Sequence, residues 1–361
     1  MKVLLAPDKF KGSLSAAEVA AHLADGLADR GIDSHPLTLA DGGDGSVAAA
    51  LSSGFRPVPI TVSGATGQLR RSVLAFDGTT AVVEVASTCG LQTLPDGPAP
   101  LSASSRGFGE ALGRAIELGP RRVVLALGGS ASTDGGAGML AALGAVFTDR
   151  HGRRMETLNG RTLPAVAAID LPRLDVEIVI ATDVRNPLLG PSGAAAVYGP
   201  QKGAAPADIA YLNAGLDHFV QLADARSLAD TPGAGAAGGI GFAALLLGGK
   251  IVSGADFFLD LLDFPTALRS CDLVVTGEGR IDSQTAEGKL AAAVARRSDG
   301  VPVIAVVGHS VLAREDAAAL GLSAVHALTN YSTDPAADPR LSGELLRRIA
   351  RTIELPGREN R

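Results

Sequence analysis

The sequence predicts an α/β protein in which both chain ends build one parallel-sheet domain and the middle of the chain forms a second, inserted mixed α/β domain. Three features of the chain indicate this fold. The first forty residues alternate strand, helix and strand, the last ninety repeat that alternation, and short turns join the apolar runs between them. A chain of 361 residues, 46% of them hydrophobic, is long enough for two domains. We expect residues 1–60 and 268–361 to form the discontinuous domain and residues 61–267 to form the insert.

The first forty residues predict a strand, a helix and a second strand. Residues 3–6 are a short apolar run that is typical of a buried strand. Ser15 and Glu18 have the spacing of a helix capping box, and the apolar residues that follow recur every four positions. Gly31 then ends the helix, and residues 34–39 have the pattern of a strand. Two strands joined by one helix over so few residues indicate a parallel pair.

The last ninety residues continue the same alternation. We expect strands at 272–276, 301–307 and 324–328, with helices at 285–297 and 314–320 between them. The chain closes with an amphipathic helix whose apolar face carries Leu341, Leu345, Ile349 and Ile353. These elements predict further parallel strands that join the N-terminal pair in one sheet.

The middle of the chain follows a different pattern. The apolar runs 57–62, 69–76 and 81–85 are linked by short turns, which suit antiparallel neighbours because a parallel crossover needs a dozen or more residues. Residues 123–127 and 177–181 are further apolar strands, each followed by a polar or glycine-rich loop. The insert is therefore expected to hold a mixed sheet.

Residues suited to chemistry collect where the expected strands end. Parallel α/β sheets bind ligands just beyond the carboxyl ends of their strands. Five such ends carry carboxylates, glycines or cations, namely the loops 8–13, 41–45, 128–136, 182–186 and 277–282. Turn formation alone could explain glycine and aspartate in any one of these loops. Their occurrence in all five favours a ligand site.

The residue types in these loops indicate phosphoryl transfer. Glycines with Ser, Thr and Lys suit phosphate, because backbone N–H groups at helix starts hold anions and a lysine neutralises their charge. Carboxylates suit Mg²⁺ and can serve as a base for a hydroxyl nucleophile. Phosphoryl transfer requires these parts. The sequence contains no G-x-x-x-x-G-K-[ST] motif, so it predicts a kinase without a P-loop.

Two other classes of function compete with a kinase. Residues 233–238 match G-x-G-x-x-G, the fingerprint of a nicotinamide-dependent oxidoreductase, but residues 221–230 before them look helical where that motif requires a strand. A glycine-rich start to a helix at 240–247, near a nucleotide or substrate, is the alternative for this segment. A two-domain protein that binds a small acid without chemistry is the other class, and it would not need several carboxylates.

Composition excludes several partners. The net charge is −6, and the chain has no tryptophan and only 4% aromatic residues, so we expect no nucleic-acid binding. Cys89 and Cys271 provide neither a disulfide framework nor a zinc pattern. The N-terminal residues lack the apolar stretch of a signal peptide, and no apolar run reaches the ~20 residues of a membrane span. We therefore expect a soluble, cytoplasmic protein without membrane contact, whose oligomeric state the sequence does not specify.

Taken together, the loops resemble the bacterial type-1 glycerate kinase family. The resemblance covers nearly the whole chain in one order, and its matching stretches are residues 6–14, 41–45, 128–138, 183–188, 199–204, 232–239 and 277–285. It implies ATP-dependent phosphorylation of D-glycerate with Mg²⁺, to 2-phosphoglycerate in many bacterial members. It also implies a flavodoxin-like domain carrying an inserted α/β domain, with the active site in the cleft between them. The 3-phosphoglycerate product and a related small hydroxy acid as substrate remain alternatives.

Roles for individual residues follow from their places at strand ends. Asp183 is the candidate base for the glycerate hydroxyl, and Lys9 and Asp8 are the other candidate catalytic residues. Asp44 and Asp282, with Asp8 as an alternative, are the candidate Mg²⁺ ligands. The expected substrate- or phosphate-binding residues are Lys11, Ser13, Asp41, Gly128, Gly129, Ser130, Thr133, Asp134, Asn186, Gln201, Lys202, Glu278, Arg280, Gln284 and Thr285. Lys202 could equally be an ordinary surface lysine, and which aspartate is the base stays open.

Overall fold

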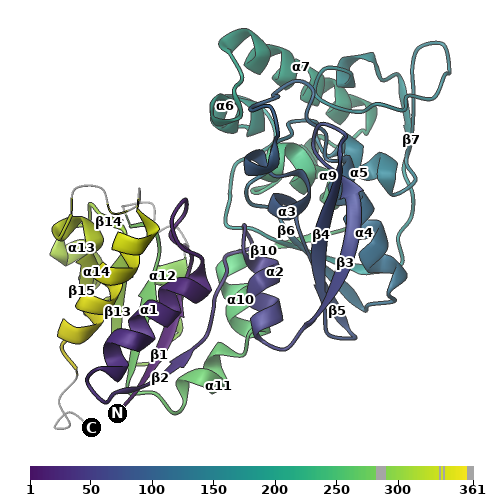
Figure 1. The fold of residues 1–361 in the computed structure, drawn as a ribbon. Coiled ribbons are helices and arrows are strands. Elements are labelled where there is room, and N and C mark those ends of the chain that lie inside the picture. Colours follow the sequence, from purple (N-terminus) through teal and green to yellow (C-terminus); the bar gives the residue numbers. More distant parts are fainter. Residues whose placement is uncertain (282–289, 333–334, 336–337, 356–361) are drawn as a thin grey trace. The chain divides into compact units, whose positions relative to one another are not determined.

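The computed structural model describes residues 1–281, 290–332, 335 and 338–355 (Figure 1). The chain divides into two compact units, the first made of Met1–Asp41 with Ala255–Arg361 and the second of Gly42–Gly254. These boundaries differ from the expected ones at 60/61 and 267/268. Residues 42–60 join the second unit because strand β3 (Arg56–Ser63) pairs along its whole length with β4 there. The two helices before residue 268 join the first unit.

The first unit holds a five-stranded, all-parallel sheet in the order β15-β13-β11-β1-β2. Its strands are β1 (Lys2–Pro7), β2 (Asp33–Pro36), β11 (Leu273–Gly277), β13 (Val303–Val307) and β15 (Ala324–Ala327). Counted within the unit, this order is 2-1-3-4-5, which is the flavodoxin-like order. The fold class that the sequence predicts is confirmed, and the strand order reverses between β1 and β11.

Helices cover this sheet, and all of the α-helices except α10 and α11 lie where the sequence pattern predicts. They are α1 (Ala16–Ala28), α10 (Gly254–Leu261), α11 (Phe264–Leu268), α12 (Leu290–Arg297), α13 (Arg314–Ala319) and α14 (Pro339–Thr352), with the 3₁₀ turn η6 (Leu328–Asn330). The predicted capping box starts α1: the Ser15 N–H donates to Glu18 Oε2 at 2.8 Å, and the Glu18 N–H donates to Ser15 Oγ at 3.3 Å. The first residues of the helix expected at 285–297 lie outside the described residues.

Packing between elements far apart in the chain completes the first unit. Helices α1 and α14 lie side by side (Figure 1), and a Cβ added at Gly26 would sit 2.4 Å from the Arg347 carbonyl oxygen. Helix α10 is tied to α12 by ion pairs of Asp256 with Arg296 and of Asp260 with Arg297. These contacts join α10 to the first unit.

The second unit holds a six-stranded mixed sheet in the order β10-β9-β6-β5-β4-β3. Its further strands are β4 (Leu69–Phe76), β5 (Thr80–Glu84), β6 (Arg122–Ala126), β9 (Glu177–Ala181) and β10 (Lys250–Val252). Strands β3, β4 and β5 pair antiparallel, as their short turns predict, whereas β5, β6, β9 and β10 are parallel. The carboxyl ends of β5, β6 and β9 therefore meet at one edge.

Short helices surround this mixed sheet. They are α2 (Ser46–Ser52), α3 (Val85–Cys89), α4 (Arg106–Glu117), α5 (Ala137–Ala142), α6 (Ala194–Tyr198), α7 (Pro206–Leu222), α8 (Arg226–Ala229) and α9 (Ile240–Leu246), with the 3₁₀ turns η1 (Leu91–Thr93), η2 (Leu163–Ala165), η3 (Pro200–Lys202) and η4 (Ala236–Gly239) and the hairpin β7 (Val146–Thr148)–β8 (Ala168–Asp170). Phe219 packs edge-on against Phe242 in the core, with ring centroids 5.5 Å apart. Within the described ranges, no helix has the length and apolar character that a membrane crossing requires.

Candidate active site

The first unit gathers the predicted residues around the point where its strand order reverses. The Asp8 N–H donates to the Gly277 carbonyl at 2.7 Å, which joins the loop after β1 to the end of β11. Phe10 and Leu14 close the loop by exchanging backbone hydrogen bonds of 2.8 and 3.1 Å, and both side chains are buried. Lys11 is exposed on this closed turn, and its position is set by the backbone alone.

The loop after β11 lies against the loop after β1. A Cβ added at Gly279 would lie 3.2 Å from the Lys11 nitrogen, so the two backbones approach closely. The short strand β12 (Arg280–Ile281) pairs with β14 (His309–Ser310) and holds Arg280 at this edge. The structure thus brings Lys11 and Arg280 into one region of the first unit.

Other predicted residues of the first unit lie in different surroundings. Lys9 Nζ lies 3.7 Å from Asp8 Oδ1, and both side chains are largely buried. Asp41 lies beyond Leu39, whose N–H donates to the Pro7 carbonyl, so Asp41 comes to the same sheet edge as Asp8. Ser13 is engaged elsewhere, since its hydroxyl donates to Ser342 Oγ on α14 at 3.2 Å. Asp282, Gln284 and Thr285 lie outside the described residues.

In the second unit, the glycine-rich loop 128–136 follows β6 and is held firmly along its length. The Leu91 N–H donates to the Gly129 carbonyl at 2.8 Å, and the Ala131 N–H donates to the Cys89 carbonyl at 2.9 Å. Burial raises the pKa of the Cys89 thiol to about 12, so this cysteine remains protonated and serves packing. Contacts within the protein therefore hold the conformation of this loop.

Asp134 organises the loop through a fully buried carboxylate. It accepts hydrogen bonds from the Ser105 N–H and hydroxyl, both at 2.8 Å, and from the N–H groups of Gly136 and Gly138 at 3.1 and 3.3 Å. Burial raises the pKa of Asp134, and these four hydrogen bonds oppose that shift by favouring the carboxylate. The carboxylate therefore ties the loop to the start of α4 and to the first turn of α5.

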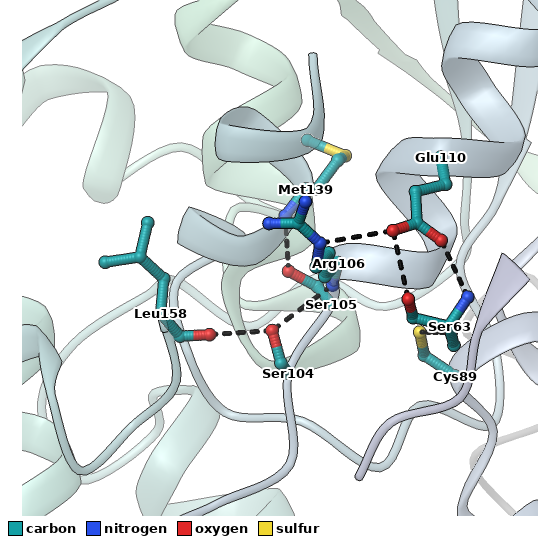
Figure 2. Close-up of polar contacts among 8 residues, drawn as sticks. All are labelled: Ser63, Cys89, Ser104, Ser105, Arg106, Glu110, Met139 and Leu158. Atoms are coloured by element: carbon teal, nitrogen blue, oxygen red, sulfur yellow. Dashed lines mark hydrogen bonds and ion pairs between the residues drawn. The ribbon is translucent and has the colours of Figure 1, made fainter. Parts of the chain in front are cut away.

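Ser105 is a residue that the sequence reasoning missed. Its hydroxyl also accepts the Met139 N–H at 2.9 Å, while Ser104 donates to the Leu158 carbonyl at 2.6 Å (Figure 2). Figure 2 also shows Glu110 of α4 bonded to Ser63. The available signal was a serine pair directly before a helix, a position that favours serine.

Lys202 is neither a surface lysine nor an exposed anion ligand in this structure. It is 2% exposed, and its Nζ donates to Ser130 Oγ at 2.8 Å and to the Ser132 carbonyl at 2.6 Å. Burial lowers the pKa of Lys202 to about 8, against an opposing effect of Asp134. Gln201 beside it is exposed. Within the described part of the chain, the buried hydroxyls of Ser132 and Thr133 have no hydrogen-bond partner.

Asp44 and Asp183 come from loops that meet the glycine-rich loop at the same sheet edge. A Cβ at Gly42 would lie 2.3 Å from the Ala181 carbonyl oxygen, and a Cβ at Gly128 would lie 2.5 Å from Gly43 Cα. Only glycine permits these approaches. Asp183 follows β9, and its Oδ1 accepts the Gly254 N–H at 3.0 Å.

Two further polar residues at this edge have structural partners. Asn186 donates from Nδ2 to the Ser192 carbonyl and accepts the Tyr198 hydroxyl, both at 2.7 Å. Glu84, at the end of β5, is buried and accepts the Val47 N–H at 3.1 Å. Glu84 was missed by the sequence reasoning, although a carboxylate ending an apolar strand is the same signal that singled out Asp183.

The segment 232–239 supports the glycine-rich loop and does not form a dinucleotide fingerprint. It follows helix α8 where the fingerprint needs a strand. The Gly135 N–H donates to the Gly238 carbonyl at 3.0 Å, and a Cβ at Gly238 would lie 2.1 Å from the Ser132 carbonyl oxygen. Close packing of two backbones explains these glycines.

A magnesium ion fits this donor set only when a ligand brings further oxygens. Among the described residues, no group of three His, Cys, Asp or Glu side chains is placed to hold a metal. Mg²⁺ usually takes one or two protein carboxylates together with water and substrate phosphates. Asp44 or Asp183 can supply such a carboxylate.

Known proteins share both the sequence and the fold of this chain. Residues 3–355 match the model of the glycerate kinase family. The chain is 41% identical over 325 residues to a glycerate kinase of Bacillus subtilis (strain 168) and 38% identical over 333 residues to a glycerate 2-kinase of Escherichia coli (strain K12), covering 85% of each chain in both pairs. A crystal structure of a glycerate kinase 2 from Salmonella typhimurium LT2 matches with a TM-score of 0.81 at 37% identity, over 98% of this chain and 96% of that one. The resemblance that the loops indicate is therefore confirmed, and this chain belongs to the glycerate kinase family of enzymes.

Proposed function

We infer that this enzyme transfers the γ-phosphoryl group of ATP to D-glycerate with Mg²⁺ and forms 2-phosphoglycerate. The observation that carries this proposal is the meeting of Asp44, the loop 128–136 and the Asp183 loop at the carboxyl ends of β6 and β9. A phosphate-binding loop beside carboxylates is what phosphoryl transfer to a hydroxyl requires. The name of the Escherichia coli relative, a glycerate 2-kinase, supports the 2-position.

Each part of the reaction has a candidate group. Asp183 accepts the proton of the 2-hydroxyl while that oxygen attacks the γ-phosphorus, the bond from the γ-phosphorus to the bridging oxygen breaks, and ADP leaves. The backbone of the loop 128–134 binds the phosphates. Asp44, or alternatively Asp282, would supply a carboxylate ligand to Mg²⁺, which would neutralise the negative charge of the phosphates.

The first unit supplies cations to the same reaction. Lys9, Lys11 and Arg280 are proposed to bind the glycerate carboxylate or the phosphates, with Asp8 and Asp41 beside them. We assign Ser13 and Asn186 to holding their loops, because their side chains form hydrogen bonds with other residues of the same unit.

The cellular setting is a proposal of the same kind. Cys89 and Cys271 are free, buried thiols, which is typical of a reducing compartment. Together with the proposed use of ATP, this supports a cytoplasmic enzyme with small molecules as its partners.

Coupled turnover of ATP with D-glycerate and Mg²⁺, followed by phosphorus NMR of the product, tests the function. Phosphate on the 2-oxygen is the expected result. Phosphate on the 3-oxygen would keep the kinase and overturn the position. A folded protein that binds D-glycerate but turns over neither it nor other small hydroxy acids would instead be the non-catalytic binding protein.

A further inference from the structure

A buried ammonium group lies behind the proposed phosphate loop and contacts two of its residues. Lys202 reaches from η3, and its Nζ donates to Ser130 Oγ and to the Ser132 carbonyl. These two acceptors lie on either side of Ala131, directly before Thr133 and Asp134. One side chain thereby fixes the distance between two points of the loop, and its own 2% exposure leaves it almost no access to a ligand.

A second buried ionisable group, Asp134, lies in the same loop. Asp134 is the ionisable group that acts on the Lys202 ammonium, and its carboxylate is also fully buried. The two residues hold opposite sides of the loop: Asp134 ties it to Ser105 and α5, and Lys202 ties it to η3. A neutral amine at position 202 would make weaker hydrogen bonds to Ser130 and Ser132.

We propose that Lys202 is a positioning residue for ATP binding, whose protonated ammonium holds the loop 128–134 in the shape that receives the phosphates, and that it is not itself a phosphate ligand. This role rests on the proposed function. Displacement of a binding group by about 1 Å can cost roughly a hundredfold in rate. Loss of the positive charge at Lys202 therefore reduces the affinity for ATP although the lysine does not contact it.

The test follows the dissociation constant of Mg-ATP by calorimetry, together with kcat/KM for ATP, from pH 6.5 to 9.5. In the wild type we expect the dissociation constant to rise and kcat/KM to fall above pH about 8, which is the pKa of the buried lysine. In Lys202→Met we expect affinity at least tenfold weaker at pH 7, with that alkaline decline absent. Lys250→Met, which removes an exposed lysine on β10 of the same unit, is expected to keep both wild-type properties.

A second variant keeps the test decisive if Lys202→Met does not fold. Ser130→Ala removes one acceptor of the ammonium, so it lowers the pKa of Lys202 and moves the alkaline decline to lower pH. The positioning role would be overturned if folded Lys202→Met kept the wild-type affinity for Mg-ATP or still lost affinity above pH about 8. It would also be overturned if Ser130→Ala lost affinity at the same pH as the wild type. The dissociation constant of Mg-ATP can be measured by calorimetry without glycerate. A wild-type protein that binds Mg-ATP but does not phosphorylate glycerate would therefore overturn the proposed function and leave the positioning role of Lys202 intact.

Discussion

The loops at the two sheet edges are built in opposite ways. In the first unit, Lys11 and Arg280 are exposed, and backbone hydrogen bonds shape the loops that carry them. In the second unit, Ser130, Asp134 and Lys202 are buried and shape the loop with their own side chains. The first edge thus offers side chains to a ligand, whereas the second offers backbone held by side chains. We therefore expect substitutions that change charge to matter most at the first edge, and substitutions that change the loop conformation to matter most at the second.

Asp183→Asn is expected to have the largest effect and would show whether the second edge also contributes a reacting side chain. Loss of a positioned base typically costs about a hundredfold to ten-thousandfold in kcat. The fold should survive, because the asparagine oxygen can still accept the Gly254 N–H. Turnover of ATP with D-glycerate measures the effect, with Asp96→Asn at an exposed site as the matched control. Near-normal turnover of folded Asp183→Asn would refute its role as the base.

A pair of glycine substitutions compares the packing at the two edges. Gly238→Ala puts a Cβ 2.1 Å from the Ser132 carbonyl oxygen at φ +68°, so strain and overlap together should cost about 3 kcal/mol or more of unfolding free energy. Gly12→Ala, in the loop after β1, meets no atom within 4 Å and carries only the strain of φ +82°, about 1 kcal/mol. Urea unfolding of both variants measures the difference. Equal losses would contradict the prediction that the contact with Ser132, and not the positive φ alone, requires glycine at position 238.

The pH dependence of stability isolates the buried charge at the second edge. The pKa of Lys202 falls from 10.5 to about 8 on folding, so between these values the unfolded chain holds a proton that the native protein has released. Stability from this group therefore rises as pH increases through about 8, by at most about 3 kcal/mol near pH 10.5. The difference in urea midpoint between the wild type and Lys202→Met (wild type minus variant) should increase from pH 7 to pH 9.5. A difference that shrinks over this range would show that the ammonium is not desolvated.

Lys11→Met is expected to have the smallest effect, confined to substrate binding. Removal of one charge-assisted contact costs about 1.5 kcal/mol, which corresponds to a KM raised roughly tenfold. Stability should not change, because Lys11 is exposed. Lys2→Met is the matched control, since Lys2 starts the same strand at the opposite sheet edge and donates to Ser270. Equal KM values in both variants would remove Lys11 from the candidate site.

Local patterns allowed much of the fold to be predicted. The Ser15–Glu18 capping box, the short turns between β3, β4 and β5, and the alternating elements of the first unit are all present. The domain boundaries differ because they depend on distant partners. Residues 56–63 join the sheet of the second unit by pairing with β4, and α10 joins the first unit through its ion pairs with α12.

The candidate site was predictable in its loops but not in the part that each side chain plays. Gln201-Lys202-Gly203 has the composition of a surface turn, and nothing local shows that the lysine lies against Ser130, 72 positions earlier in the chain. Likewise, Asp134 looks like a ligand until its four donors from α4 and α5 are placed around it. Ser105 and Glu84 escaped notice for the same reason.

By itself, the sequence determined the main strands of both sheets, the helices that alternate with them at the two chain ends, and the order of the loops, because periodicity, caps and turn residues act between neighbours in the chain. It also determined the family, because the motifs keep their order over nearly the full length. Only the tertiary structure decided which polar groups are buried and what they hold. Burial and the close approach of glycine backbones depend on segments that the chain separates and only folding brings together.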